Sequence, residues 1–317
     1  MSLKNETFEP ADRSHLSMGI DIGSTTAKVA VLDENRQLIF SAYRRHKAEI
    51  VKVLITSLKE AFNTLGDVQV DLLMTGSAGM GVAEKYTLPF IQEVVASAEV
   101  VKQLYPEVKT LIDIGGEDAK MIFFNKRGVP DIRMNGSCAG GTGAFLDEMA
   151  TLLNVSVSEL NHLAEQHKEI HPIASRCGVF AKTDVQNLLS REISREDISA
   201  SIFHALVYQT LATLARGYDL KPVIIFSGGP LTFLPSLREA FKEELGVGTD
   251  GVLEVENSEL LPAIGAALAK QTNKHNTALM DLINYLQSPP PIKTNHQKRL
   301  PALFQDETSF IVWKQDQ

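Results

Sequence analysis

The chain has 317 residues, of which 44% are hydrophobic and 22% charged, and its formal net charge at pH 7 is −8. This composition is typical of a globular protein with a sizeable core, and the length allows two ordinary domains. The acidic balance argues against a nucleic-acid-binding surface, which is normally basic. No apolar run approaches the roughly 18 residues of a membrane span, and the N-terminus has no signal-peptide pattern. We therefore expect a cytoplasmic protein with neither nucleic acid nor membrane as a partner.

The first part of the chain reads as an α/β lobe. Residues 1–16 are polar and patternless, and we interpret them as a disordered tail or a cloning remnant. Two β-runs that flank the polar turn DENRQ predict a hairpin over residues 17–45. The elements expected after it are a helix near 48–66, a buried strand at 70–76 and a helix near 93–104. We assign residues 17–109 to this first lobe.

A second hairpin is predicted at 110–135, with NKRG as its turn, and it opens a second lobe over residues 110–271. The elements expected after this hairpin are helices near 142–153, 157–168, 181–191 and 194–220, a strand at 222–229, and helices near 234–245 and 258–271. Strands that alternate with helices indicate an α/β architecture. Residues 272–317 contain a proline-rich stretch, and we interpret them as a linker and tail, or as the start of a truncated further region.

One phrase occurs twice, as IDIGSTTAK at 20–28 and as IDIGGEDAK at 112–120, with six of nine positions identical. Each copy places an Asp-x-Gly bend at the end of a strand. Such a bend offers backbone N–H groups and small side chains that bind phosphate oxygens. The candidate nucleotide-binding residues in the two copies are Gly23, Ser24, Thr25, Thr26, Lys28, Gly115, Gly116 and Asp118. Asp21 and Asp113 are expected to hold Mg²⁺ through water. Neither a P-loop nor a Rossmann glycine pattern is present.

A third glycine pattern, FSGGP at 226–230, follows a predicted strand and precedes a helix. Gly228, Gly229 and Pro230 would let the backbone pack under a flat adenine, although an ordinary strand-to-helix turn has the same pattern. The order of the three patterns resembles the superfamily of actin, sugar kinases and heat-shock chaperones. That resemblance implies two duplicated ribonuclease-H-like lobes with a nucleotide cleft between them. The stretches at 75–79 and 262–269 resemble the two connecting segments of that superfamily.

The two cysteines, Cys138 and Cys177, each lie in a turn that leads into a predicted helix. A helix N-terminus favours the thiolate form of a cysteine. From composition alone, two inert buried cysteines remain the simpler interpretation. Two thiolates are too few for a closed four-cysteine site, whereas a symmetric homodimer would supply four. Their spacing does not decide between these alternatives.

The stretches DIGGEDAK, CAGGTGAFLDEMA and SRCGVFAKTDV resemble the ATP-dependent activators of 2-hydroxyacyl-CoA dehydratases and the related ATPase subunits of benzoyl-CoA reductases. The resemblance implies a homodimer with one bridging [4Fe–4S] cluster, to which Cys138 and Cys177 of each subunit are the ligands. In the cysteine-containing stretch, Gly141 and Thr142 are further candidate nucleotide contacts. The candidate catalytic residues are Asp21, Asp113 and Glu117; many short activators have Gln at the last of these positions.

The function that this resemblance implies is ATP-driven electron transfer in an anaerobic host. ATP and Mg²⁺ would drive a low-potential electron from a ferredoxin or flavodoxin to an iron–sulfur dehydratase or a benzoyl-CoA reductase-like partner. One alternative is a small-molecule, sugar-type kinase of the same superfamily, with Asp118 or Asp184 as a nominal base. Another alternative is a regulatory nucleotide-binding ATPase. A kinase gives no reason for two cysteines at helix starts.

Overall fold

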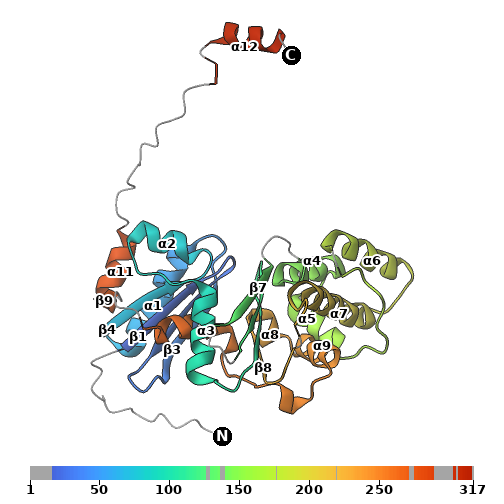
Figure 1. The fold of residues 1–317 in the computed structure, drawn as a ribbon, viewed down its shortest axis with the longest axis horizontal. Helices are drawn as coiled ribbons and strands as arrows, with labels where there is room; N and C mark the ends of the chain where they lie inside the picture. Colours follow the sequence, from blue (N-terminus) through green and yellow to red (C-terminus); the bar gives the residue numbers. More distant parts are fainter. Residues whose placement is uncertain are drawn as a thin grey trace.

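Two mixed β-sheets, each flanked by helices, form two lobes that lie side by side (Figure 1). The computed structural model describes residues 16–125, 129–135, 140–175, 177–218, 220–270, 275–288, 303–304 and 306–315. The first sheet has the order β3-β2-β1-β4-β9, and the second has the order β7-β6-β5-β8. The predicted α/β class with two lobes is therefore confirmed.

The two sheets share one plan, in which an antiparallel meander of three strands is followed by a fourth strand parallel to the first. The strands of the first sheet are β1 (Leu16–Ile22), β2 (Thr26–Leu32), β3 (Leu38–Arg45), β4 (Gln69–Thr75) and β9 (His275–Ala278). Those of the second are β5 (Thr110–Ile114), β6 (Ala119–Phe123), β7 (Asp131–Asn135) and β8 (Ile224–Ser227). In each lobe the parallel partner, β4 or β8, pairs with the strand that leads into the repeated bend.

The repeated phrase forms the first reversal of each meander. The pattern predicts a single hairpin in each copy, but the chain turns back at the bend itself and makes three strands instead of two. The Gly23 N–H donates to the Thr26 carbonyl at 2.9 Å, and the Gly115 N–H donates to the Asp118 carbonyl at 2.8 Å. These backbone bonds close the bends, so both strands of each reversal stay paired.

The helices of the first lobe and its connection are α1 (Ile50–Leu65), α2 (Gly79–Tyr86) and α3 (Glu93–Leu104). Those that follow the second meander are α4 (Gly143–Leu153), α5 (Val157–Ala164), α6 (Gly178–Ser190), α7 (Arg195–Leu214), α8 (Gly229–Phe233), α9 (Pro235–Leu245) and α10 (Leu261–Leu268). The pattern overestimates α7, which ends at Leu214 rather than near residue 220. It also misses α2.

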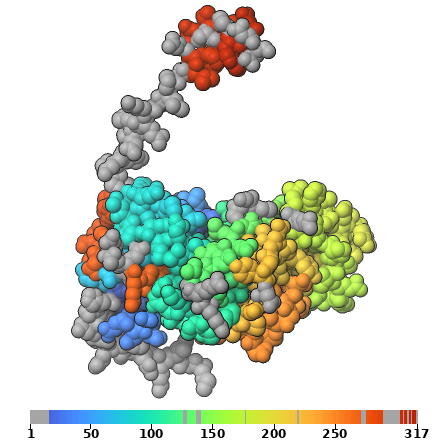
Figure 2. Space-filling model, in the orientation of Figure 1, coloured from blue at the N-terminus to red at the C-terminus, as the bar shows by residue number. Residues whose placement is uncertain are grey.

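Part of the predicted tail belongs to the first lobe. Strand β9 pairs antiparallel with β4, and α11 (Leu279–Gln287) packs against α1. The short, mainly polar sequence HNTA of β9 gives little strand signal by itself, because its partner strand supplies the pairing. The last helix, α12 (Glu307–Gln315), lies apart from both lobes (Figures 1 and 2).

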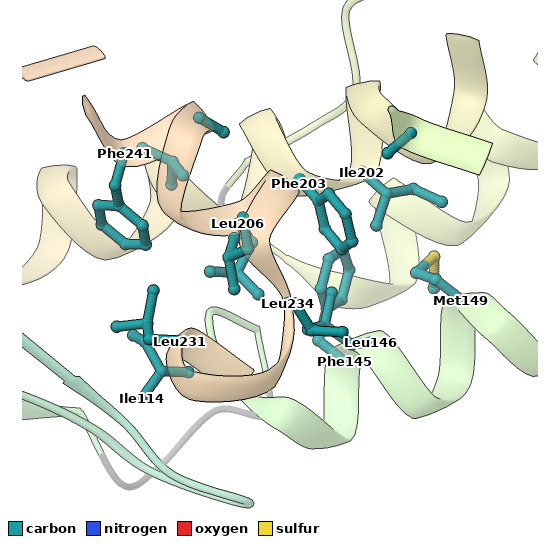
Figure 3. Close-up of a cluster of buried hydrophobic side chains, with 14 of the residues drawn as sticks. Ile114, Phe145, Leu146, Met149, Ile202, Phe203, Leu206, Leu231, Leu234 and Phe241 are labelled. Atoms are coloured by element: carbon teal, nitrogen blue, oxygen red, sulfur yellow. The ribbon is translucent and has the colours of Figure 1, made fainter. Parts of the chain in front are cut away.

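The core of the second lobe fixes α4 against its neighbours (Figure 3). The buried side chains that meet there are Phe145, Leu146 and Met149 of α4, Ile202, Phe203 and Leu206 of α7, and Leu231, Leu234 and Phe241 of the α8–α9 region. Close packing of this kind transmits displacement, because the interior has low compressibility. Helices α4 and α7 are therefore expected to move together.

A separate core joins the two lobes through α10. A Cβ on Gly19 of β1 would overlap the Ala263 carbonyl, and a Cβ on Gly265 would overlap the Ala96 carbonyl of α3. The same cluster contains Ala30 and Leu32 of the first sheet and Leu111, Ile122 and Ile225 of the second. Glycine thus allows α10 to lie directly on β1 and α3, which holds the lobes together.

Candidate functional site: a cleft between the two repeated bends

A cleft of about 980 Å³, measured out to its open mouth, lies between the lobes. The predicted nucleotide-binding residues that line it are Gly23, Ser24, Thr25, Thr26, Lys28, Gly115, Gly116, Asp118, Gly228, Gly229 and Pro230. Gly141 and Thr142 are buried just before α4 and do not line the cleft. The structure thus brings all three glycine patterns to one place.

The two bends and the start of α8 lie so close to neighbouring atoms that glycine is required at two positions. A Cβ on Gly116 would overlap Thr25 Oγ1 of the opposite bend. Gly228 has a φ of 86°, and a Cβ there would overlap the Ile114 carbonyl. The small residues therefore allow both bends and the start of α8 to approach a common ligand.

In the first lobe, a buried ion pair stands directly behind the bend. Lys28 Nζ lies 2.7 Å from Asp21 Oδ2, and these two residues face each other across β1 and β2. Burial alone would lower the pKa of Lys28, but Asp21 and Asp113 together raise that pKa above its usual value. Asp21 is fully buried, and its Oδ1 atom has no hydrogen-bond partner among the described residues. Such an orphaned acceptor fits a water or a hydrated cation.

The second lobe repeats the strand register of the first lobe but not its close aspartate–lysine ion pair. Asp113 faces Lys120 across β5 and β6, yet Lys120 Nζ lies 3.9 Å from Asp113 Oδ1. The lysine instead binds Glu93 Oε1 at 2.7 Å and Asp118 Oδ2 at 2.9 Å. Asp113 Oδ2 accepts a hydrogen bond from Ser227 Oγ at 2.6 Å. The duplicated sequence therefore produces two electrostatically different halves.

Glu93 lines the cleft at the first position of α3 and was not among the candidates from the sequence. Its pKa is raised to about 7, first because the side chain is buried and then because Asp21, Asp113 and Asp118 are near; Lys120 opposes the shift. No local motif marks this glutamate, since its partner Lys120 follows 27 residues later.

His46 supports the first bend and was likewise missed. The Ala48 N–H donates to His46 Nδ1 at 3.2 Å, so the proton of the neutral ring is on Nε2. Nε2 then donates to the Gly23 carbonyl at 3.1 Å. The buried imidazole ties the bend to the loop between β3 and α1.

Two pairs of side chains cross between the lobes at the mouth of the cleft. Tyr43 of β3 and Phe233 of α8 pack edge to face, with ring centroids 5.4 Å apart. Arg45 NH1 lies 3.5 Å from Asp147 Oδ2 of α4. All four side chains line the cleft. The aromatic pair lies beside Gly229 and Pro230 and offers an apolar wall against which the base of a nucleotide could pack.

Glu117, predicted as catalytic, is exposed and does not line the cleft. Asp184, a nominal kinase base, accepts a hydrogen bond from the Ala174 N–H at 2.8 Å. Asp118, the other nominal base, is held by Lys120. Both aspartates thus have structural partners.

The predicted cluster ligands are only partly described. Cys138 lies outside the described residues. Cys177 is a half-buried free thiol at the N-cap position of α6. Within the described ranges, no group of three or more His, Cys, Asp or Glu side chains is arranged to hold a metal ion. None of the described helices combines the length and the apolar character needed to cross a membrane.

Two lobes of one plan, with paired glycine bends at a shared cleft, define an ATPase of actin-like architecture. Residues 18–269 match the BadF/BadG/BcrA/BcrD ATPase family, and the chain belongs to that family. It is 32% identical over 264 residues to the activator of lactoyl-CoA dehydratase from Anaerotignum propionicum, covering 80% of this chain and 96% of that protein.

Two solved structures are similar over most of the chain. One is (R)-2-hydroxyglutaryl-CoA dehydratase component A from Acidaminococcus fermentans, with a TM-score of 0.70 and 28% identity over 80% of this chain and 97% of that one. The other is the activator of 2-hydroxyisocaproyl-CoA dehydratase from Clostridium difficile with bound ADPNP, with a TM-score of 0.68 and 27% identity over 87% of this chain and 99% of that one. These findings confirm the predicted family and the actin-like fold.

Proposed function

We propose that this protein is an ATP-dependent activator that delivers a low-potential electron to an iron–sulfur dehydratase or a benzoyl-CoA reductase-like partner. The observation that carries the proposal is the attachment of α4 to the second bend. The Gly143 N–H donates to the Gly115 carbonyl at 2.9 Å, and the Ala144 N–H donates to the Gly116 carbonyl at 2.8 Å. Helix α4 follows the segment that contains Cys138, so the cleft and this thiol are joined by a short stretch of chain.

ATP or ADP would occupy the cleft. The two bends and Lys28 would bind its phosphates, and the adenine would lie near Gly228, Gly229 and Pro230. Mg²⁺ fits behind the phosphates, because Asp21 has a buried unpartnered oxygen and Asp113 is near. There it would neutralise phosphate charge. Catalysis by Asp21, Asp113 and Glu117 is part of the proposal; of these three residues, Glu117 is exposed and lies outside the cleft lining.

The four cysteine ligands of a [4Fe–4S] cluster would come from two subunits, two from each. Cys177 begins α6, and a Cβ on the next residue, Gly178, would lie 3.8 Å from Phe145 Cδ2 of α4. The start of α6 is therefore adjacent to α4, which follows Cys138. Two thiols per chain make a homodimer necessary for four ligands. The cluster would supply one-electron chemistry, with ferredoxin or flavodoxin as the donor.

Nucleotide-dependent movement would reach both thiols through α4. Lys182 Nζ of α6 lies 3.0 Å from Glu148 Oε1 of α4, so the two helices are also joined at their surfaces. A bend that rearranges when the γ-phosphate leaves would move α4 first and α6 with it. This coupling would link ATP hydrolysis to electron delivery in the cytoplasm.

Anaerobic purification with iron and sulfide analysis tests the proposal. We expect about four irons per dimer, lost in Cys138→Ala and in Cys177→Ala while nucleotide affinity is kept. An EPR spectrum of the reduced protein should change on addition of ATP and Mg²⁺. An iron-free protein that phosphorylates a sugar would establish the kinase alternative instead. An iron-free protein that only binds and hydrolyses ATP would point to the regulatory ATPase.

A further inference from the structure

Glu93 occupies the place where the two lobes and the cleft meet. It opens α3, whose Ala96 lies directly against Gly265 of the lobe-joining helix α10. Its side chain is largely buried but lines the cleft. One carboxylate oxygen, Oε1, accepts from Lys120 of the second lobe at 2.7 Å. No hydrogen bond reaches Oε2 from the described residues, so this oxygen remains available to a ligand.

The other acidic groups of the cleft are already engaged. Asp113 accepts from Ser227, and Asp118 is paired with Lys120. Asp147 is at the mouth with Arg45. Asp21 is fully buried behind the first bend and paired with Lys28. Glu93 shares Lys120 with Asp118, but it stands at the junction of the lobes and combines access to the cleft with an oxygen that no described residue bonds, whereas Asp113 is assigned to Mg²⁺ in the proposed function.

We propose that Glu93 is the general base of ATP hydrolysis, the residue that accepts a proton from the attacking water. The water oxygen forms a bond to the γ-phosphorus, while the bond from that phosphorus to the β–γ bridging oxygen breaks. ADP leaves with the electron pair of that bond. The water proton passes to a Glu93 carboxylate oxygen and then to solvent, so the products are ADP, inorganic phosphate and one released proton.

The surroundings of Glu93 suit this task. A general base is most effective when its pKa lies near the working pH, and that of Glu93 is raised to about 7. The charged groups that face it come from every element around it: Asp21 and Lys28 of the first sheet, and Asp113, Asp118 and Lys120 of the second lobe. Lys120 holds the carboxylate in place, so proton transfer requires no large rearrangement of the side chain.

The inference rests on the ATP hydrolysis of the proposed function but not on its cluster or its electron transfer. The test compares Glu93→Gln, Glu93→Asp and the control Glu99→Gln, which changes another glutamate of α3. Glu99 bonds to Gln103 and does not line the cleft. Steady-state ATP hydrolysis, affinity for a fluorescent non-hydrolysable ATP analogue, and the pH profile of kcat are measured for each variant.

We expect kcat of Glu93→Gln to fall by about 100-fold or more, with analogue affinity within about threefold of wild type. Glu93→Asp should retain more activity than Glu93→Gln, because it keeps a carboxylate. The pH profile of kcat should be the same in wild type and Glu99→Gln, and the limb that reports ionisation of the base should be absent in Glu93→Gln.

A merely structural role predicts a different pattern. The Gln amide oxygen can still accept from Lys120, so Glu93→Gln would then keep more than about a tenth of the wild-type kcat, and that result overturns the inference. A loss of kcat that is matched by a loss of analogue affinity also overturns it. An iron-free wild-type protein whose hydrolysis depends on Glu93 as described would refute electron transfer and leave this inference standing.

Discussion

Gly116 of the second bend packs so closely on Thr25 of the first that a Cβ would overlap the threonine Oγ1. This contact joins two turns that are 91 residues apart in the chain and belong to different lobes. The width of the cleft between the two bends is therefore set by the absence of a side chain at residue 116.

Gly116→Ala should weaken nucleotide binding without unfolding either lobe. The added methyl group must displace Thr25 or separate the bends, and we expect affinity for an ATP analogue to fall about tenfold or more. Calorimetric titration measures this change. The control is Gly81→Ala on α2, where an added Cβ meets no atom within 4 Å. Wild-type affinity in Gly116→Ala would show that the bends do not enclose the phosphates.

Lys28→Met should destabilise the fold much more than removal of a surface lysine. It leaves the Asp21 carboxylate buried without its partner, and breaking a buried pair in this way costs about 3–5 kcal/mol. In the matched control, Lys52→Met removes an exposed lysine paired with Glu49 at 2.9 Å, at a cost of about 1 kcal/mol or less. Urea denaturation of both variants measures the difference. Equal midpoints would mean that the Asp21 carboxylate is solvated in the folded protein.

The repeat made both bends predictable because each is specified locally. An Asp-x-Gly after an apolar strand positions its own turn, and the 92-residue offset carries the same register into both sheets. The proposed cluster ligands rest on resemblance to a family rather than on spacing.

Contacts that depend on the tertiary fold gave no signal in the sequence. Glu93 reaches Lys120 across 27 residues, and Ser227 reaches Asp113 across 114. Nothing in the local sequence distinguishes Glu93 from any acidic residue in the first turn of a helix. The difference between the two halves of the site arises from these long-range partners, which the repeat itself cannot encode.

Glu93 should make stability depend on pH. Because its pKa is about 7 when folded and 4.5 in a model peptide, the folded state holds the proton more tightly. Its contribution to stability is present below about pH 4.5 and is lost as the pH rises through 7, by on the order of 3 kcal/mol. Lys28 and Lys120 stay protonated throughout this window.

Chemical denaturation at pH 5, 6, 7 and 8 checks this dependence. The free energy of unfolding of wild type should decrease relative to that of Glu93→Gln over this range, since glutamine does not titrate. Glu99→Gln serves as the control, and its curve should run parallel to that of wild type. If the Glu93→Gln curve also runs parallel, the glutamate is ionised at ordinary pH and its burial is offset by Lys120.

The bond from Gly143 to Gly115 predicts that nucleotide state alters the reactivity of Cys177. The second bend holds the first turn of α4, and α4 reaches α6 through Glu148 and Lys182. In cluster-free Cys138→Ala protein, the rate at which a thiol reagent labels Cys177 should differ at least about twofold between ADP and a non-hydrolysable ATP analogue. Adding Lys182→Gln should reduce this difference while nucleotide affinity is unchanged. Lys242→Gln, which removes a lysine paired with Glu239 and Glu254 outside α4 and α6, should leave it intact. Equal labelling rates in every nucleotide state would mean that α4 does not carry the movement of the bend to the start of α6.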